Sequence, residues 1–188
     1  EILNPAPVIA VGSVLIPWLM NCAALLDVGI RLRPQEIGGL MAIGVTNIPV
    51  MHRPKVAILS TGDEIISPSA EPSPGQVRDV NSYTLSALVT SAGGMPIRYG
   101  IIPDQYKVLD RIAQEAHTAS DFVIITAGTS VSARDIPADV IAGLGKPGIL
   151  VHGIAIKPGK PTILAVADSI PVIGLPGNPV SALIAARL

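Results

Sequence analysis

The stretch Lys55-Val56-Ala57-Ile58-Leu59-Ser60-Thr61-Gly62-Asp63-Glu64 decides the fold. Its apolar run, Val56 to Leu59, has the length of a strand buried inside a sheet, and the glycine that follows predicts a turn. Parallel sheets contain such strands because helices cover both of their faces. The stretch therefore predicts a buried parallel strand whose end carries a hydroxyl group and two carboxylates.

Strands and helices alternate from this point to the end of the chain. Further strands are predicted at Ile97–Ile102, Phe122–Thr126, Ile149–Ile156, Thr162–Ala167 and Pro171–Leu175. Helices are predicted from Asn81, as the cap, to a stop at Gly93-Gly94, at Gln105–Ala119, at Ile136–Leu144, and after Asn178, whose neighbour Pro179 takes the first helical position. The alternation predicts right-handed crossovers and a three-layer α/β/α domain with a mostly parallel sheet.

A polar hinge at His52-Arg53-Pro54 predicts a domain boundary near Pro54, with residues 1–53 on one side and the main domain, residues 54–188, on the other. The first part is expected to contain one short helix, Pro34–Ile43. The uncharged stretch Val8–Leu26 has the length of a membrane span, but prolines and polar residues interrupt it and no Lys or Arg precedes it. We therefore expect a segment buried against a neighbour, and no membrane association.

The composition favours a small-molecule partner. The chain of 188 residues carries a net charge of −1 with only 14% charged residues, whereas nucleic-acid binding requires a basic face. Cys22 is the only cysteine, which excludes a disulfide or a Cys-based zinc site within one chain. A reducing, cytoplasmic setting is expected.

Loops after the predicted strands are suited to a phosphorylated ligand. In Ala127–Asp135, small and hydroxyl residues allow backbone N–H groups to point into a common space. The lysines of Lys157–Pro161 lie in a stiff Pro-Gly-Pro frame that fixes their charges at little entropic cost. Tight turns, helix caps and solvated lysines are the structural alternatives. The candidate ligand-binding residues are Thr61, Gly62, Asp63, Gly128, Thr129, Ser130, Ser132, Arg134, Lys157, Lys160, Pro176, Gly177, Asn178 and Ser181.

Carboxylates also follow the ends of predicted strands and are expected to converge on one edge of the sheet: Asp63, Glu64, Asp104 and Asp135. Acids alone would repel a phosphorylated ligand, so a hard cation such as Mg²⁺ is expected between them. Two further acids, Asp79 and Asp139, are interpreted as turn or first-turn helix residues.

These strings resemble the molybdopterin-binding domain of MoeA and of the gephyrin E region. The matches occur in the same order and span Pro54 to Leu188: residues 55–64, the helix at Asn81, Ile101–Asp104, Ala127–Asp135, Ile156–Pro161 and Gly174–Ser181. The resemblance implies a molybdopterin molybdotransferase of molybdenum cofactor biosynthesis. In such an enzyme molybdate is inserted into adenylated molybdopterin with the help of Mg²⁺, and AMP is released.

The resemblance also implies roles for individual residues. Glu64, Asp104 and Asp135 would be the catalytic acids and the Mg²⁺ ligands, and the two lysines, Lys157 and Lys160, would hold phosphate or the oxyanion. The loops at 127–132 and 176–181 would frame the pterin nucleotide, so that electrostatic positioning carries much of the chemistry. A homo-oligomer, either a dimer or a trimer, is implied as well.

The sequence departs from the family pattern in places. Ala127-Gly128 replaces the usual paired glycines, which puts a methyl group where close backbone approach is expected. A complete MoeA chain begins with a β-rich region and ends with a small β-barrel; residues 1–53 resemble only the tail of that region, so a truncated chain is expected. Arg134 beside Asp135 is similar to the MogA adenylyltransferases. A molybdopterin adenylyltransferase and a non-catalytic pterin-binding or oligomerisation module therefore stay open as alternatives.

Overall fold

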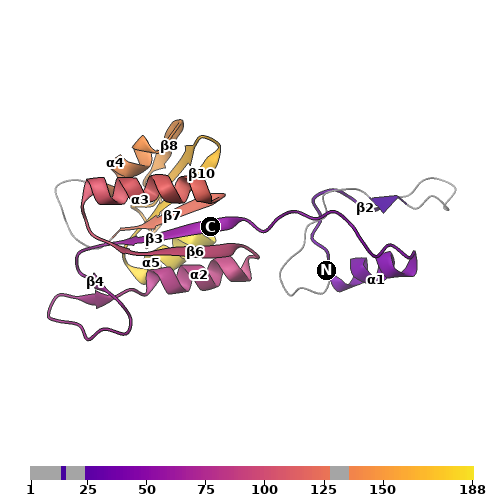
Figure 1. Cartoon of the computed structure of the whole chain (residues 1–188), viewed down its shortest axis with the longest axis horizontal. Helices are drawn as coiled ribbons and strands as arrows, with labels where there is room; N and C mark the ends of the chain where they lie inside the picture. Colours follow the sequence, from indigo (N-terminus) through magenta and orange to yellow (C-terminus); the bar gives the residue numbers. More distant parts are fainter. Residues whose placement is uncertain (1–13, 16–23, 128–135) are drawn as a thin grey trace. The chain divides into compact units, whose positions relative to one another are not determined.

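The structure, a computed structural model, describes residues 14–15, 24–127 and 136–188 of the chain (Figure 1). These residues fall into two compact units. One consists of the residues up to Arg53 together with Ser91–Gly93, and the other of Pro54–Thr90 and Gly94–Leu188.

The first unit is small. Strand β1 (Val14–Leu15) pairs antiparallel with β2 (Ala24–Leu26), and helix α1 (Pro34–Ala42) follows. Leu26, Leu32 and Leu40 form its apolar core. Helix α1 begins with a proline in its first turn, as expected, and Glu36 accepts a hydrogen bond from the backbone N–H of Arg33 at 2.8 Å.

The second unit is built on a six-stranded sheet. In spatial order its strands are β6 (Met95–Ile102), β3 (Lys55–Thr61), β7 (Phe122–Thr126), β10 (Ile170–Leu175), β9 (Ile163–Ala167) and β8 (Pro147–His152). Strands β6, β3, β7 and β10 run parallel, whereas β9 runs antiparallel to both of its neighbours. The mostly parallel sheet predicted from the sequence is confirmed.

Alternate side chains of β3 enter different apolar clusters. Ala57 and Leu59 pack with helices α3 (Tyr106–Ala119) and α4 (Ile136–Gly143). Val56 and Ile58 pack on the other face with helices α2 (Asn81–Ser91) and α5 (Pro179–Arg187). Since successive side chains of a strand point to opposite faces, one strand joins both layers of helices to the sheet (Figure 1).

The predicted strand at residues 149–156 is wrong at both ends. Strand β8 begins at Pro147 and ends at His152. Gly153 then adopts a φ of +90°, a left-handed conformation that ends the extended run. The apolar residues Ile154 and Ile156 belong to the loop that follows, so their hydrophobicity was misleading.

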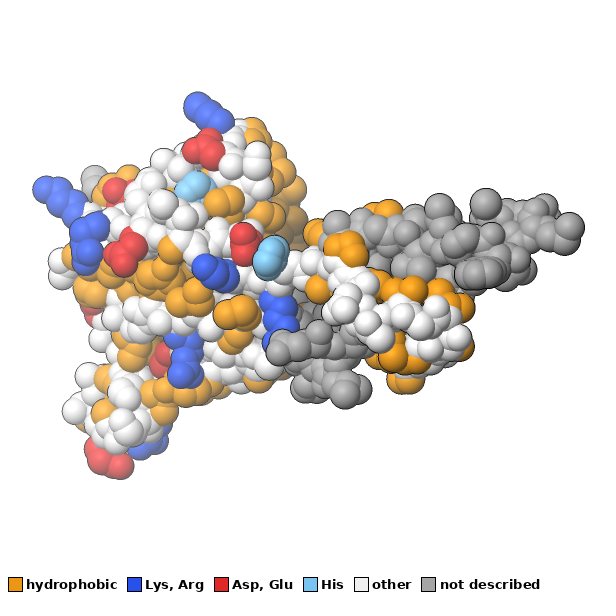
Figure 2. All heavy atoms as spheres, turned by 45° about the vertical axis from the view of Figure 1, so that its right-hand side comes forward, with side chains coloured by type: hydrophobic (Ala, Val, Ile, Leu, Met, Phe, Trp, Pro, Cys, Tyr) orange, Lys and Arg blue, Asp and Glu red, His pale blue; other side chains and the backbone are white. Residues whose placement is uncertain are grey.

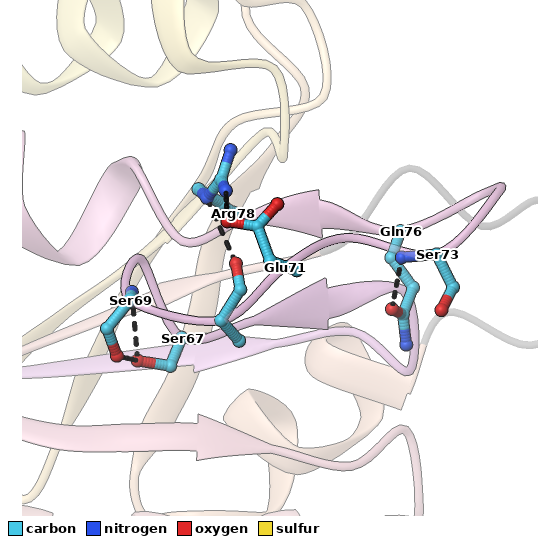
Figure 3. Close-up of polar contacts among 7 residues, drawn as sticks. Ser67, Ser69, Glu71, Ser73, Gln76 and Arg78 are labelled. Carbon is cyan, nitrogen blue, oxygen red and sulfur yellow. Dashed lines mark hydrogen bonds and ion pairs between the residues drawn. The ribbon is translucent and has the colours of Figure 1, made fainter.

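Residues 62–80 form an excursion between β3 and α2 in which β4 (Ile65–Ile66) pairs parallel with β5 (Val77–Arg78). The tip is held by its own polar groups (Figure 3): the N–H of Ser73 donates to Gln76 at 3.0 Å, and Arg78 donates to the carbonyl of Ala70 at 3.2 Å. The sequence predicted only a loop here because each strand is two residues long.

On the face of the α/β unit that Figure 2 displays, basic and acidic side chains are interspersed. A large basic face of the kind that nucleic acids require is not seen on that side. Among the described helices, none is both long and apolar enough to cross a membrane.

Candidate functional site

The loops that carry the predicted site residues leave the sheet at one edge. The parallel strands β3, β6, β7 and β10 end there, at the left of the α/β unit in Figure 1. Strand β8 ends at the same edge, because β9 runs antiparallel to both β8 and β10. Ligands of open α/β sheets bind outside the carboxyl ends of the strands, so this edge is the candidate site.

The ends of β3 and β6 are joined by hydrogen bonds between predicted site residues. The buried hydroxyl of Thr61 donates to Oδ1 of Asp104. Oδ1 of Asp63 accepts from the backbone N–H of Asp104 at 3.1 Å. The structure therefore brings Thr61, Asp63 and Asp104 together, although they come from two different strand ends.

The absence of a side chain at Gly62 leaves room for the carboxylate of Glu64. A Cβ at Gly62 would lie 2.9 Å from Oε2 of Glu64 and 2.9 Å from a side-chain carbon of Ile65. The φ of Gly62 is +155°, and its N–H donates to the carbonyl of Ile102 at 3.2 Å. A side chain at this position would displace the Glu64 carboxylate, so Gly62 contributes by leaving this space open.

A buried polar network behind this edge was missed from the sequence. Asp79, only 6% exposed, accepts from the hydroxyl of Ser60 at 3.3 Å and from the N–H of Ser82 at 3.1 Å. The hydroxyl of Ser82 also donates to it, and Thr126 at the end of β7 lies 3.5 Å from the Ser60 oxygen. Asp79 had been interpreted as a turn or helix residue; the available signal was its position three residues before Ser82, the spacing of a helix-capping side chain.

Asn81 does not cap α2, contrary to the expectation from the sequence. The carboxylate of Asp79 takes the capping role, and Asn81 is the first helical residue. Its Nδ2 donates instead to the carbonyl of Gly177, at 2.8 Å. Because Gly177 belongs to the loop after β10, this contact joins α2 to a predicted ligand-binding loop.

The loop after β10 leads into α5 as expected. Oδ1 of Asn178 accepts from the N–H groups of Val180 at 3.1 Å and Ser181 at 3.2 Å, with Pro179 in the first turn. Pro176 is half-buried. Because α5 follows β10, the positive end of its dipole lies at the carboxyl edge of the sheet, where an anion is favoured.

The loop between β8 and β9 is closed by its own backbone. Gly153 donates to Thr162 at 2.9 Å, and Ile154 to Lys160 at 2.9 Å. Gly159 has a φ of +116° and is buried. Lys157 and Lys160 are exposed, and no ion pair with another described residue holds either ammonium group. The stiff frame predicted from the prolines carries two unpaired positive charges.

Several predicted site residues lie outside the described part of the chain: Gly128, Thr129, Ser130, Ser132, Arg134 and Asp135. Their loop begins at Ala127, whose N–H donates to the carbonyl of Leu175 at 3.2 Å. Among the residues that are described, no group of three His, Cys, Asp or Glu side chains is placed to hold a metal ion.

The sequence matches a known family. The family model described as a probable molybdopterin binding domain (MoCF_biosynth) matches residues 57–188. A molybdopterin molybdenumtransferase from Nostoc sp. PCC 7120 is 37% identical over 163 residues, which is 85% of this chain and 37% of the relative. The Bacillus subtilis molybdopterin molybdenumtransferase is 32% identical over 157 residues, which is 84% of this chain and 36% of that protein. The chain thus spans little more than a third of these relatives.

Solved structures agree with these matches. A molybdopterin biosynthesis MoeA protein from Pyrococcus horikosii superposes with a TM-score of 0.72 at 39% identity, covering 86% of this chain and 39% of that one. A MoaB enzyme from Thermus, at 18% identity and a TM-score of 0.53, shares the fold and covers 69% of this chain. The resemblance predicted from the loop motifs is confirmed, and the chain belongs to the molybdopterin binding domain family.

Proposed function

We propose that this chain is the molybdopterin-binding part of a molybdopterin molybdenumtransferase and acts in molybdenum cofactor biosynthesis. It would hold adenylated molybdopterin while molybdate is inserted and AMP is released. One observation carries the proposal: Thr61 and Asp63 are both hydrogen-bonded to Asp104 at the carboxyl edge of the sheet. The names of the relatives, which are molybdopterin molybdenumtransferases, support it.

The phosphate groups of the ligand would bind to fixed positive charge. Lys157 and Lys160 are exposed on a loop whose backbone is closed by hydrogen bonds. Little entropy is lost when such lysines meet an anion, because the loop is already ordered. The positive end of the α5 dipole would add to this attraction, with Asn178 and Ser181 shaping the loop. Gly128, Thr129, Ser130, Ser132 and Arg134 are proposed as further phosphate ligands on sequence grounds alone.

Thr61 would orient an acid at the reacting end of the ligand. It is 1% exposed, and its hydroxyl donates to Asp104. A hydrogen bond from a buried, ordered group restricts the rotamers of a carboxylate, so Asp104 would meet molybdate or a bound cation in a fixed direction. We propose Glu64, Asp104 and Asp135 as the acids that act on the metal-transfer step.

Magnesium is proposed as a cofactor shared with the ligand. The described residues do not form a protein cage for a metal ion. Mg²⁺ is commonly held by one or two carboxylates together with substrate phosphates and water, and Asp104 and Glu64 fit that lesser role. When bound, the ion would neutralise phosphate charge and draw the acids and the phosphates together.

Calorimetric titration of the purified chain with adenylated molybdopterin, with and without Mg²⁺, tests the proposal. We expect saturable binding with one ligand per chain, about tenfold tighter with Mg²⁺. Replacing Asp135 with Asn should reduce the Mg²⁺ effect while the circular dichroism spectrum stays unchanged. Absence of binding under both conditions would refute the proposal. Transfer of AMP from ATP to molybdopterin would identify an adenylyltransferase, and binding without turnover a non-catalytic module.

Self-association is proposed as well, as a dimer or a trimer. Sedimentation equilibrium of the same preparation measures it directly. A monomer at concentrations that saturate ligand binding would contradict this part of the proposal.

A further inference from the structure

The side-chain amide of Asn81 uses its nitrogen in a hydrogen bond, but its oxygen has no partner among the described residues. Its side chain is 5% exposed, and Nδ2 donates to the carbonyl of Gly177 at 2.8 Å. A carbonyl can only accept, so this contact fixes which end of the carboxamide is nitrogen and which is oxygen. The amide plane is thereby locked beside the loop of residues 175–181.

The other end of the same carboxamide has no partner. Among the described residues, no group donates a hydrogen bond to Oδ1 of Asn81, although the atom is buried. Buried acceptors in native proteins are almost always satisfied by protein, water or ligand, because an unsatisfied one loses its hydration without compensation. An N–H or O–H donor is therefore expected at this position in the working protein.

Local structure does not use this oxygen. The carboxylate of Asp79 accepts from the N–H of Ser82, so the start of α2 is capped without Asn81. The start of α5 is capped by Asn178. Both helix starts are satisfied by other side chains, which leaves ligand recognition as a role for the Asn81 oxygen.

The chemistry of the missing donor can be narrowed. A neutral carbonyl oxygen repels phosphate oxygens, so the phosphorylated part of a ligand does not suit it. It accepts well from the amino group of a flat nitrogen heterocycle, and both the pterin and the adenine of an adenylated pterin carry one. Loss of such a hydrogen bond discriminates strongly when the protein group is buried, since that group is then left unpaired.

We propose that Asn81 is a specificity-determining residue. Nδ2 holds the loop through Gly177, and Oδ1 accepts a hydrogen bond from a heterocyclic amino group of the ligand. This inference rests on the proposed function, because it takes the ligand to be a pterin or an adenine nucleotide.

The test compares ligands that differ by the amino group. Pterin is compared with lumazine, which has a carbonyl oxygen in place of the 2-amino group, and AMP with purine riboside 5′-monophosphate, which lacks the adenine amino group. Dissociation constants are measured by calorimetry. The wild-type chain should prefer the amino ligand of one pair by about tenfold, the effect of one hydrogen bond to a buried group. The pair that shows the preference identifies which ring Asn81 contacts.

Two variants separate recognition from positioning. In Asn81→Leu, of similar size, both hydrogen bonds are lost and the preference should fall to about one. In Asn81→Asp, the contact with Gly177 is lost but an acceptor remains, so all affinities should fall while the preference persists. Asn47→Leu, at an exposed asparagine whose side chain donates to the neighbouring Thr46, is the matched control and should leave every value unchanged.

Each outcome has a definite meaning. Equal measurable binding of all ligands by the wild-type chain would overturn the role of Asn81 and leave the proposed function standing. A preference that survives in Asn81→Leu would overturn it too, since Asn81 would then act on the loop alone. If the wild-type chain binds none of the four ligands, the inference is wrong, and the titration with adenylated molybdopterin decides the proposed function separately.

Discussion

Thr61 donates its hydroxyl hydrogen bond to Asp104, although Thr61 ends β3 and Asp104, 43 positions further along the chain, follows the end of β6. The pairing of β3 with β6 places them side by side, with Thr61 opposite Ile102. The hydrogen bond therefore forms only when β3 and β6 pair in this register. It also orients one of the proposed catalytic acids.

Replacement of Thr61 by Val should impair activity more than stability. The buried hydroxyl is lost while the shape is kept, at a cost of about 1–2 kcal/mol in unfolding free energy. Without its donor, Asp104 should point less consistently at the reacting group, and the rate of AMP release should fall by about tenfold or more. Urea denaturation and an AMP-release assay measure the two effects. Thr118→Val, at an exposed hydroxyl on α3 that bonds within its own helix, should change neither.

The loop lysines are expected to act on ligand affinity alone. Replacing Lys157 and Lys160 with Met should weaken binding of adenylated molybdopterin by about tenfold each, as loss of a charge-assisted hydrogen bond does. Unfolding free energy should not change, because no residue in the described part of the chain forms an ion pair with either ammonium group. Lys146, exposed and preceding β8 at the other edge of the sheet, is the control. Equal weakening by Lys146→Met would indicate general charge attraction and contradict a site at the loop.

Gly159 should tolerate no side chain. Its φ is +116°, and a Cβ would lie 2.6 Å from Cδ1 of Ile156. Gly159→Ala is expected to lower the unfolding free energy by about 1–3 kcal/mol and to weaken ligand binding through the displaced loop. Gly38→Ala is the opposite case, because that helical glycine has open space around it and should gain about 0.5–1 kcal/mol in unfolding free energy. Equal unfolding free energies for wild type and Gly159→Ala would show that the loop adapts freely.

Asp79 should be needed for folding rather than for turnover. In Asp79→Ala the hydroxyl groups of Ser60 and Ser82 and the start of α2 lose a common acceptor, so the unfolding free energy should fall by about 2 kcal/mol. Asp79→Asn keeps an acceptor for the N–H of Ser82 and should lose about half as much. Denaturation of the two variants side by side tests this order. If Asp79→Asn lost as much unfolding free energy as Asp79→Ala, the negative charge itself would be required.

Glu36 should resist protonation. Its hydrogen bonds with Arg33 lower its pKa from 4.5 to about 2, although the Arg33 side chain is exposed. A lowered pKa means that the contribution to helix α1 is present above pH 4.5 and is lost as the pH falls through about 2. Carbon NMR of the Glu36 carboxyl group measures the titration. Arg33→Gln should return the pKa toward 4.5, and an unchanged value in that variant would assign the shift to another cause.

The sequence predicted the strands and helix ends whose signals lie in neighbouring residues. The apolar run Val56–Leu59 indicated a buried strand, and the Asn178-Pro179 pair indicated the start of α5, because both signals are local. The role of Asn81 depends on Gly177, 96 positions away, and no local pattern announces that pairing. Ile156 was misassigned to a strand because hydrophobicity alone does not distinguish a strand from a loop packed on a core.

The same holds for the candidate site: residues with a local sequence signal were predicted, and those that depend on distant partners were not. Thr61, Asp63 and Asp104 were predicted because each follows an apolar run, and parallel strands end at one edge. The buried Asp79 was underestimated because burial of an acid depends on tertiary partners, here Ser60 from β3. Residues 128–135 lie outside the described part of the chain, so the predictions for that loop remain predictions.

The reversed direction of β9 has a consequence for how ligand preference could evolve. Because β9 returns beside β8, the lysine-bearing segment is a hairpin connection and not a helical crossover. A hairpin connection can change in length or composition while the strands on either side keep their register. Residues 153–162 are thus the part of the binding edge that could be replaced as a unit, leaving the acids that follow β3 and β6 in place.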